Sequence, residues 1–160
     1  MQIQTSFADT YARARVLFLE GAAAAGMALA SHNHPLLGAQ GETLAMDIAR
    51  DGPMGAKQLL VVSSACHGAE GHCGSGVQVA ATHDAEWLDH ARSAGVAVLY
   101  IHALNPHGFS HSRRVTHENV DLNRNFQHFS AAQPLPTNPS YAELHDLLLP
   151  ATWPPTAENQ

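Results

Sequence analysis

Two clusters of chemically reactive side chains stand out in the sequence. The first, SSACHGAEGHCGSG at positions 63–76, holds two His, two Cys, one Glu and four Gly. The imidazole of His67 and the carboxylate of Glu70 can both reach one Zn²⁺ at about 2.0–2.2 Å if the chain between them curls. Gly68 and Gly71 favour such a curl, because glycine adopts conformations that other residues avoid. With twelve His in the chain this spacing also arises by chance, so a polar turn is the alternative.

The two cysteines of this segment do not extend the metal hypothesis. Cys66 and Cys73 are separated by six residues, whereas a zinc knuckle separates its cysteines by about two to four. We expect both to be small, partly buried side chains, and His72 to be a loop residue. Two cysteines are also too few to predict a disulfide framework.

The second cluster, NPHGFSHSRRVTHENVDLNRNF at positions 105–126, is rich in Arg and Asn. Arg114 and Arg124, with Asn123 beside the latter, could clamp a carboxylate, because guanidinium offers a planar fork of donors. A surface loop with solvated arginines is the alternative. The residues alone leave both interpretations open.

Each cluster directly follows an apolar run that predicts a buried strand, at residues 57–64 and 96–103. Helical patterns at residues 75–82 and 84–94 lie between the two runs, so we expect a parallel pair of strands in an α/β sheet. Ligands of such sheets bind beyond the carboxyl ends of the strands, where both clusters stand.

The remaining chain supplies the elements that support this pair. Residues 6–21 predict a helix, and residues 27–32 and 43–50 predict a hairpin across a Pro- and Gly-rich turn. The last part combines a Pro-rich stretch with one short helix. We therefore predict a domain over residues 1–132, followed by a separate segment over residues 133–160.

Composition narrows the possible partners and location. The chain has 160 residues and is 45% hydrophobic, which is enough for one core. Its net charge of −6, with eight Lys and Arg and no basic run, argues against nucleic acid or an anionic membrane as a partner. The apolar run at residues 13–30 contains Glu20 and predicts an amphipathic helix rather than a signal peptide or a span. We expect a cytoplasmic protein.

Taken together, the two clusters resemble a known family. HGAEG after one strand, then NPHGF, RRV and VDLNRNF after the next, resemble the amino-terminal part of the zinc carboxypeptidase (M14) superfamily, in its DUF2817-like branch. The resemblance covers residues 27–126. It implies a three-layer α/β/α fold with a mixed, mainly parallel sheet, incomplete at the carboxyl end, and zinc as the cofactor.

The resemblance also implies roles around the metal. His67 and Glu70 correspond to two of the three zinc ligands. Asp121 corresponds to the carboxylate that orients the first zinc-binding His, a contact that fixes the tautomer of such a ligand. A loop cap is the alternative role for Asp121.

On the substrate side, Arg114 corresponds to the arginine that polarises the scissile carbonyl, and Arg113 is the competing candidate for that role. Asn123 and Arg124 correspond to the pair that binds the terminal carboxylate of the substrate. NPHG departs from the NPDG of many carboxypeptidases, so we expect His107 to be a variant loop residue.

The implied activity is hydrolysis of a terminal amide bond in a peptide or peptide-like substrate with a free carboxylate. Deacylation of N-acyl amino acids, or an inactive fragment that binds carboxylates or a partner, are the alternatives. The third zinc ligand and the catalytic Glu of the family are expected beyond Gln160. The chain alone would then be weakly active or inactive, and a complementing downstream chain could supply both groups.

Overall fold

The computed structural model describes residues 3–128, 130, 137–152 and 154. The chain forms two compact units, Met1–Phe126 and Gln127–Gln160, which are described separately. The boundary predicted between residues 132 and 133 lies outside the described residues. Within the described part, no helix has the length and apolar character needed to cross a bilayer.

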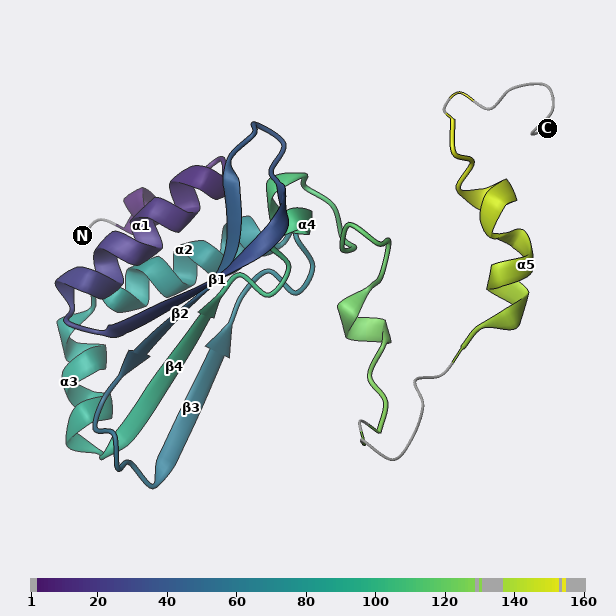
Figure 1. Ribbon diagram of the computed structural model, residues 1–160. Coiled ribbons are helices and arrows are strands. Elements are labelled where there is room, and N and C mark those ends of the chain that lie inside the picture. Colours follow the sequence, from purple (N-terminus) through teal and green to yellow (C-terminus); the bar gives the residue numbers. More distant parts are fainter. Residues whose placement is uncertain (1–2, 129, 131–136, 153, 155–160) are drawn as a thin grey trace. The chain divides into compact units, whose positions relative to one another are not determined.

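The first unit is built on a four-stranded sheet (Figure 1). Its strand order is β1-β2-β4-β3, so the strand in third place along the chain forms an edge. β1 pairs antiparallel with β2, β2 pairs antiparallel with β4, and β3 pairs parallel with β4. The strands are β1 (Ala28–Leu37), β2 (Thr43–Asp51), β3 (Gln58–Ser63) and β4 (Val96–His102).

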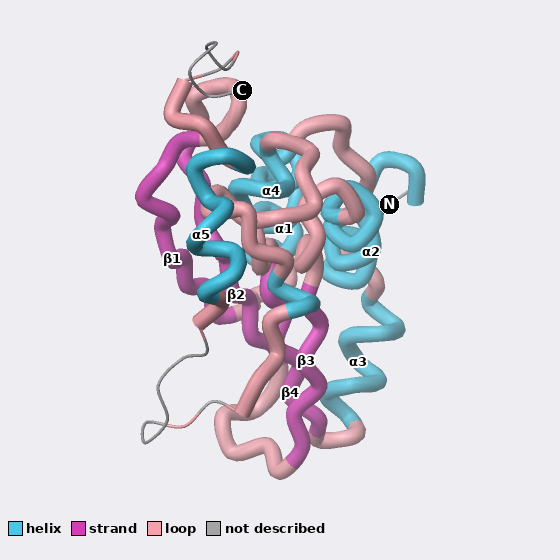
Figure 2. Tube along the Cα trace, turned by 90° about the vertical axis from the view of Figure 1, so that its right-hand side faces the viewer, coloured by secondary structure: helices cyan, strands magenta, loops and turns pink. Residues whose placement is uncertain are grey.

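Three long helices of this unit pack on one face of the sheet (Figure 1). Between β4 and the end of the first unit at Phe126, the chain is mostly loop, with α4 and η2 as its short helices (Figure 2). One helix, α5 (Pro139–Leu148), belongs to the second unit. The helices of the first unit are η1 (Ile3–Ser6), α1 (Tyr11–Ala24), α2 (Gly71–Thr82), α3 (Ala85–Ser93), α4 (Pro106–Ser110) and η2 (Leu122–Arg124).

The predicted α/β class with a mixed sheet is confirmed, as are the first hairpin and the parallel pair β3–β4. We also expected a mainly parallel sheet with helices on both faces. Of the three pairings made by the described strands, two are antiparallel, because β2 lies between β1 and β4 and runs against both. Within the first unit, α1, α2 and α3 cover a single face (Figure 1).

Two buried carboxylates on β2 attach helices to this covered face. Asp47 and Asp51 are 0% and 5% exposed. Nε of Arg15 on α1 lies 2.7 Å from Oδ2 of Asp47, and Nη2 of Arg92 on α3 lies 2.8 Å from Oδ1 of Asp51. A buried charge without a partner costs several kcal/mol, so each pair holds its helix in one position.

Candidate functional site

The carboxyl ends of β3 and β4 bring the two sequence clusters together. Backbone pairing continues past the strands, because the Ser64 amide donates to the Ile101 carbonyl at 3.1 Å and the Asn105 amide donates to the Ala65 carbonyl at 3.0 Å. The HGAEG segment therefore starts beside the NPHG segment. This arrangement follows from the parallel pairing, since both strands end at the same edge of the sheet.

Glycine makes the close approach of these segments possible. A Cβ atom at Gly68 would overlap the carbonyl group of Gly108, well inside van der Waals contact. Gly108 is held in turn by Asn105, whose Oδ1 accepts from the Gly108 amide at 2.8 Å and caps α4. This positioning role of Asn105 was missed in the sequence, although Asn followed by Pro is a typical helix start.

His67 and Glu70 lie side by side between β3 and α2. Nδ1 of His67 is 3.3 Å from Oε1 of Glu70. Glu70 is the N-cap residue of α2, and a carboxylate there interacts favourably with the positive end of the helix dipole. The side chain of His67 is 15% exposed and that of Glu70 is 62% exposed, so the pair opens to solvent on the Glu70 side.

The second ring nitrogen of His67 binds the other cluster. Nε2 lies 3.0 Å from Oδ1 of Asp121. Asp121 also accepts from Nε of Arg114 at 2.8 Å and from the Asn123 amide at 3.0 Å. Asp121 thus contacts the imidazole of His67 and caps η2, which is the loop-cap role considered for it from the sequence.

Asp121 is ionised throughout the physiological range. The Arg114 guanidinium, assisted by the hydrogen bond to His67 and opposed by partial desolvation, lowers the pKa of Asp121 to about 2. An ionised carboxylate only accepts hydrogen bonds, so Nε2 of His67 must carry the proton of this contact. In a neutral imidazole the lone pair of Nδ1 then faces the Glu70 carboxylate.

Two acceptors that face one another at 3.3 Å need a cation between them, either a proton on Nδ1 or a metal ion. Two ligands about 2.1 Å from one tetrahedral Zn²⁺ lie about 3.4 Å apart. The Nδ1 and Oε1 atoms therefore fit two corners of such a site. Among the described residues, no three His, Cys, Asp or Glu side chains are arranged to hold a metal ion.

The predicted substrate-binding residues lie in the chain after α4. Arg114 is held by Asp121, and its side chain is 48% exposed. Asn123 and Arg124 are in η2 and exposed, and Nη1 of Arg124 reaches the Asn123 carbonyl at 3.4 Å. Arg113, the competing candidate, points Nη2 at Oδ1 of Asn119 at 3.5 Å. Side-chain hydrogen bonds and ion pairs thus group His67, Glu70, Asp121 and Arg114, and leave Arg124 outside that group.

Comparison with known sequences shows the family. Residues 7–160 match the family described as "Protein of unknown function (DUF2817)". The chain belongs to the DUF2817 family. None of the curated proteins matches it.

Two solved structures resemble this DUF2817 chain at low similarity. Glutaminyl cyclase from Porphyromonas gingivalis is 16% identical, with a TM-score of 0.38 over 57% of this chain and 36% of the cyclase. The esterase LipW from Mycobacterium marinum is 24% identical, with a TM-score of 0.32 over 62% of this chain and 29% of the esterase. The DUF2817 chain thus spans about a third of each of these proteins.

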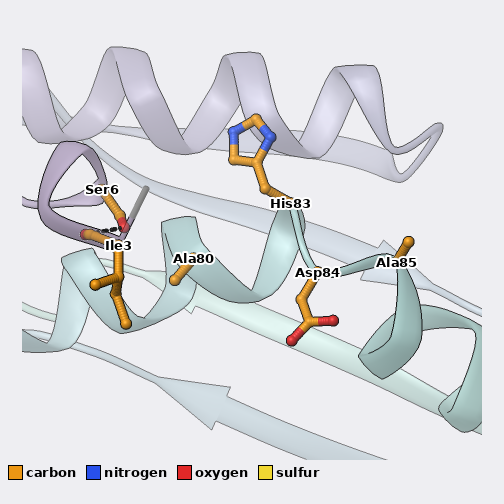
Figure 3. Close-up of a pocket in the computed structure, with 6 residues that line it drawn as sticks. All are labelled: Ile3, Ser6, Ala80, His83, Asp84 and Ala85. Carbon is orange, nitrogen blue, oxygen red and sulfur yellow. Dashed lines mark hydrogen bonds between the residues drawn. The ribbon is translucent and has the colours of Figure 1, made fainter. Parts of the chain in front are cut away.

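A hollow of the DUF2817 chain lies at the end of α2 away from His67 and Glu70 (Figure 3). Its titratable side chains are those of Asp84 and His83. Asp84 caps α3 by accepting from the Trp87 amide at 3.0 Å, and the ring of His83 is directed toward α1. Ser6 donates its hydroxyl to the Ile3 carbonyl at 2.6 Å. Among the described residues that line this hollow, no group of side chains matches the chemistry of the site around His67.

Proposed function

We propose that this chain carries the metal-binding and carboxylate-binding part of a zinc-dependent hydrolase of carboxypeptidase type. His67 through Nδ1 and Glu70 through its carboxylate would hold Zn²⁺. The substrate would be a peptide or peptide-like molecule with a free terminal carboxylate, cleaved at its terminal amide bond.

One observation carries this proposal. The contact of Nε2 with the ionised Asp121 leaves Nδ1 of a neutral His67 as an acceptor that faces another acceptor, Oε1 of Glu70, at 3.3 Å. That spacing suits adjacent ligands of a tetrahedral ion. A carboxylate behind a metal-binding His is also the arrangement that fixes the tautomer and raises the basicity of the ligand.

The other residues supply binding and charge. Arg114, fixed by its Nε contact with Asp121, presents a half-exposed guanidinium that would stabilise negative charge developing on the scissile carbonyl oxygen. Asn123 and Arg124 are exposed donors in η2 and would bind the terminal carboxylate of the substrate.

Zinc supplies Lewis-acid polarisation of the carbonyl and activation of water when it is bound. Two protein ligands bind zinc weakly, and hydrolysis also needs a general base. We therefore place the third ligand and the base outside the described residues, in a further segment or a complementing chain.

Zinc binding tests the first part of this proposal without relying on catalysis. Equilibrium dialysis of the tag-free chain should show that His67→Ala and Glu70→Gln each weaken zinc binding at least about tenfold. His90→Ala is the matched control, because His90 is an exposed residue of α3. Equal zinc affinity in wild type and His67→Ala would contradict the proposal.

Substrate class is tested on the protein together with whatever segment or chain completes the site. Blocked peptides and N-acyl amino acids both offer a free carboxylate. They differ in the group on the acyl side of the scissile amide, which is a peptide in one and a simple acyl group in the other. Hydrolysis of the peptides supports a carboxypeptidase. Hydrolysis of the N-acyl amino acids alone would favour the deacylating alternative.

A further inference from the structure

Four imidazoles gather beside the candidate site, although they come from distant parts of the sequence. The ring centres of His107 and His111 lie 4.2 Å apart and are stacked, and that of His107 is 5.9 Å from His34 and 5.8 Å from His117. His34 and His117 lie 4.8 Å apart, edge to face. These four residues are called the histidine cluster below.

The cluster joins β1 to the loop that carries Arg114 and leads to Asp121. His34 is a residue of β1, and His117 lies in the loop after α4. Nε2 of His34 and Nδ1 of His117 are 3.3 Å apart. This contact spans 83 positions of the sequence, so it fixes the loop against the sheet.

Hydrogen-bond direction shows that this contact requires neutral rings. The Leu36 amide donates to Nδ1 of His34 at 3.1 Å, so Nδ1 is an acceptor and Nε2 carries the proton. Nε2 then donates to Nδ1 of His117, which must be unprotonated. A proton added to either ring takes the place of a lone pair that now accepts a hydrogen bond.

The same chain of donors argues against a metal ion between the two rings. A metal ligand needs a lone pair on the ligating nitrogen, whereas the Leu36 contact places the proton of His34 on Nε2. The cluster is therefore described better as a proton-sensitive contact than as a second metal site.

Some charged neighbours of the histidine cluster favour a positive charge on its rings, and others disfavour one. Burial lowers the pKa of His107, and Arg113 and the other three imidazoles lower it further because they disfavour a charge there. Glu42 interacts favourably with a charged His111, and Glu118 lines the same hollow as His34 and His117. A charge on His107, which is 9% exposed, is therefore disfavoured.

We propose that the histidine cluster is a pH-sensitive clamp, which holds the loop over residues 111–120 against β1 at neutral pH and releases it at mildly acidic pH. Unperturbed imidazoles titrate near pH ~6.5, and two charged rings in contact repel one another. The clamp is stable while His34 and His117 are both neutral, and it is lost when they take up protons. Release would loosen the turn that ends at Val120, directly before Asp121, and so the orientation of His67.

Amide hydrogen exchange tests the clamp independently of the proposed zinc chemistry. Protection factors, which correct for the intrinsic rate at each pH, are compared by NMR at about pH 7.5 and about pH 5.0, on either side of the imidazole pKa. The reporter amides are Leu36, Thr116 and Val120, which donate to His34, to Val120 and to Thr116 respectively. In wild type their protection should fall at least about tenfold at the lower pH, while Ala49 in the middle of β2 reports the global stability at each pH, against which this local change is compared.

Variants at His117 distinguish release of the clamp from a general loss of stability at low pH. His117→Ala removes the acceptor and should give low protection of these amides at both pH values. His117→Asn offers a non-titrating acceptor in a similar place and should restore protection that no longer depends on pH. Because His117 is exposed, neither change threatens the core. Protection that is equal at the two pH values in wild type, or that still falls in His117→Asn, would overturn the proposal.

Discussion

Nε2 of His67 lies 3.0 Å from Oδ1 of Asp121, a residue 54 positions later in the sequence. This one hydrogen bond decides which nitrogen of His67 faces Glu70. It also links the HGAEG segment to the DLNRNF segment, as the proposed zinc site requires.

Replacing Asp121 with asparagine tests the value of this contact. The Asp121→Asn side chain would keep an acceptor for the Asn123 amide, but the substitution removes the charge that fixes the His67 tautomer. Zinc affinity, measured by equilibrium dialysis, should fall about 10–100-fold. Asp89→Asn is the matched control, because the Asp89 side chain is 78% exposed and makes only a weak ion pair with Arg92, at 4.0 Å. Unchanged zinc affinity in Asp121→Asn would show that the contact is merely structural.

Gly68→Ala should separate the two loops. Its Cβ would collide with the Gly108 backbone, so one segment must move, and we expect the free energy of unfolding to drop by about 1–3 kcal/mol. Gly55→Ala is the matched control, since no atom lies within 4 Å of a Cβ built there. Its unfolding free energy should change by no more than about 0.5 kcal/mol. Urea titration followed by circular dichroism measures both, and equal stability of the two variants would argue against the close approach.

Tyr11→Phe should expose the importance of a buried hydroxyl. The Tyr11 hydroxyl donates to the Ala45 carbonyl at 3.0 Å and accepts from the Ala45 amide at 2.8 Å. Its loss leaves a buried donor and a buried acceptor unpaired, which costs about 1–3 kcal/mol. Tyr141→Phe, in the exposed helix α5, is the control and should have almost no effect on unfolding by urea. A matching small effect for Tyr11→Phe would mean that water replaces the hydroxyl.

His102 should make the protein sensitive to acid. Burial lowers the pKa of His102 to about 4, and the nearby Asp47 only partly opposes this. In the unfolded chain His102 therefore takes up a proton near pH 6.5, whereas in the folded chain it takes up a proton only near pH 4. Stability is unaffected above that window and falls as the pH drops through it, by about 3 kcal/mol in total.

His102→Phe keeps a ring on Phe18, on which His102 now stacks at 4.6 Å, and removes the titration. Urea unfolding at a series of pH values from about 7 to about 4 should show a shallower loss of stability in this variant than in wild type. His90→Ala should keep the wild-type slope. An identical slope in His102→Phe would place the acid sensitivity elsewhere.

Local patterns in the sequence predicted most of the elements, and their errors have local causes. The predicted bounds of β2 and β3 agree with the structure to within a few residues, and the hairpin of β1 and β2 was predicted, because apolar periodicity is set by neighbours in the chain. The first helix begins at Tyr11, later than predicted, because the Thr10 side chain accepts from the Arg13 amide and caps it. The second begins at Gly71, earlier than predicted, and so takes in His72, which we expected in a loop.

Residue types and spacing by themselves determined the family motifs, the α/β class and the strands after which each motif stands. Only the tertiary structure decided how those groups face one another: the proton on Nε2 of His67, the approach of Gly68 to Gly108, and the burial of His107, which we expected in a variant loop. The reason is physical. A side chain's hydrogen-bond direction and burial depend on partners that are brought near by the sheet, and no local pattern encodes which distant residues those will be.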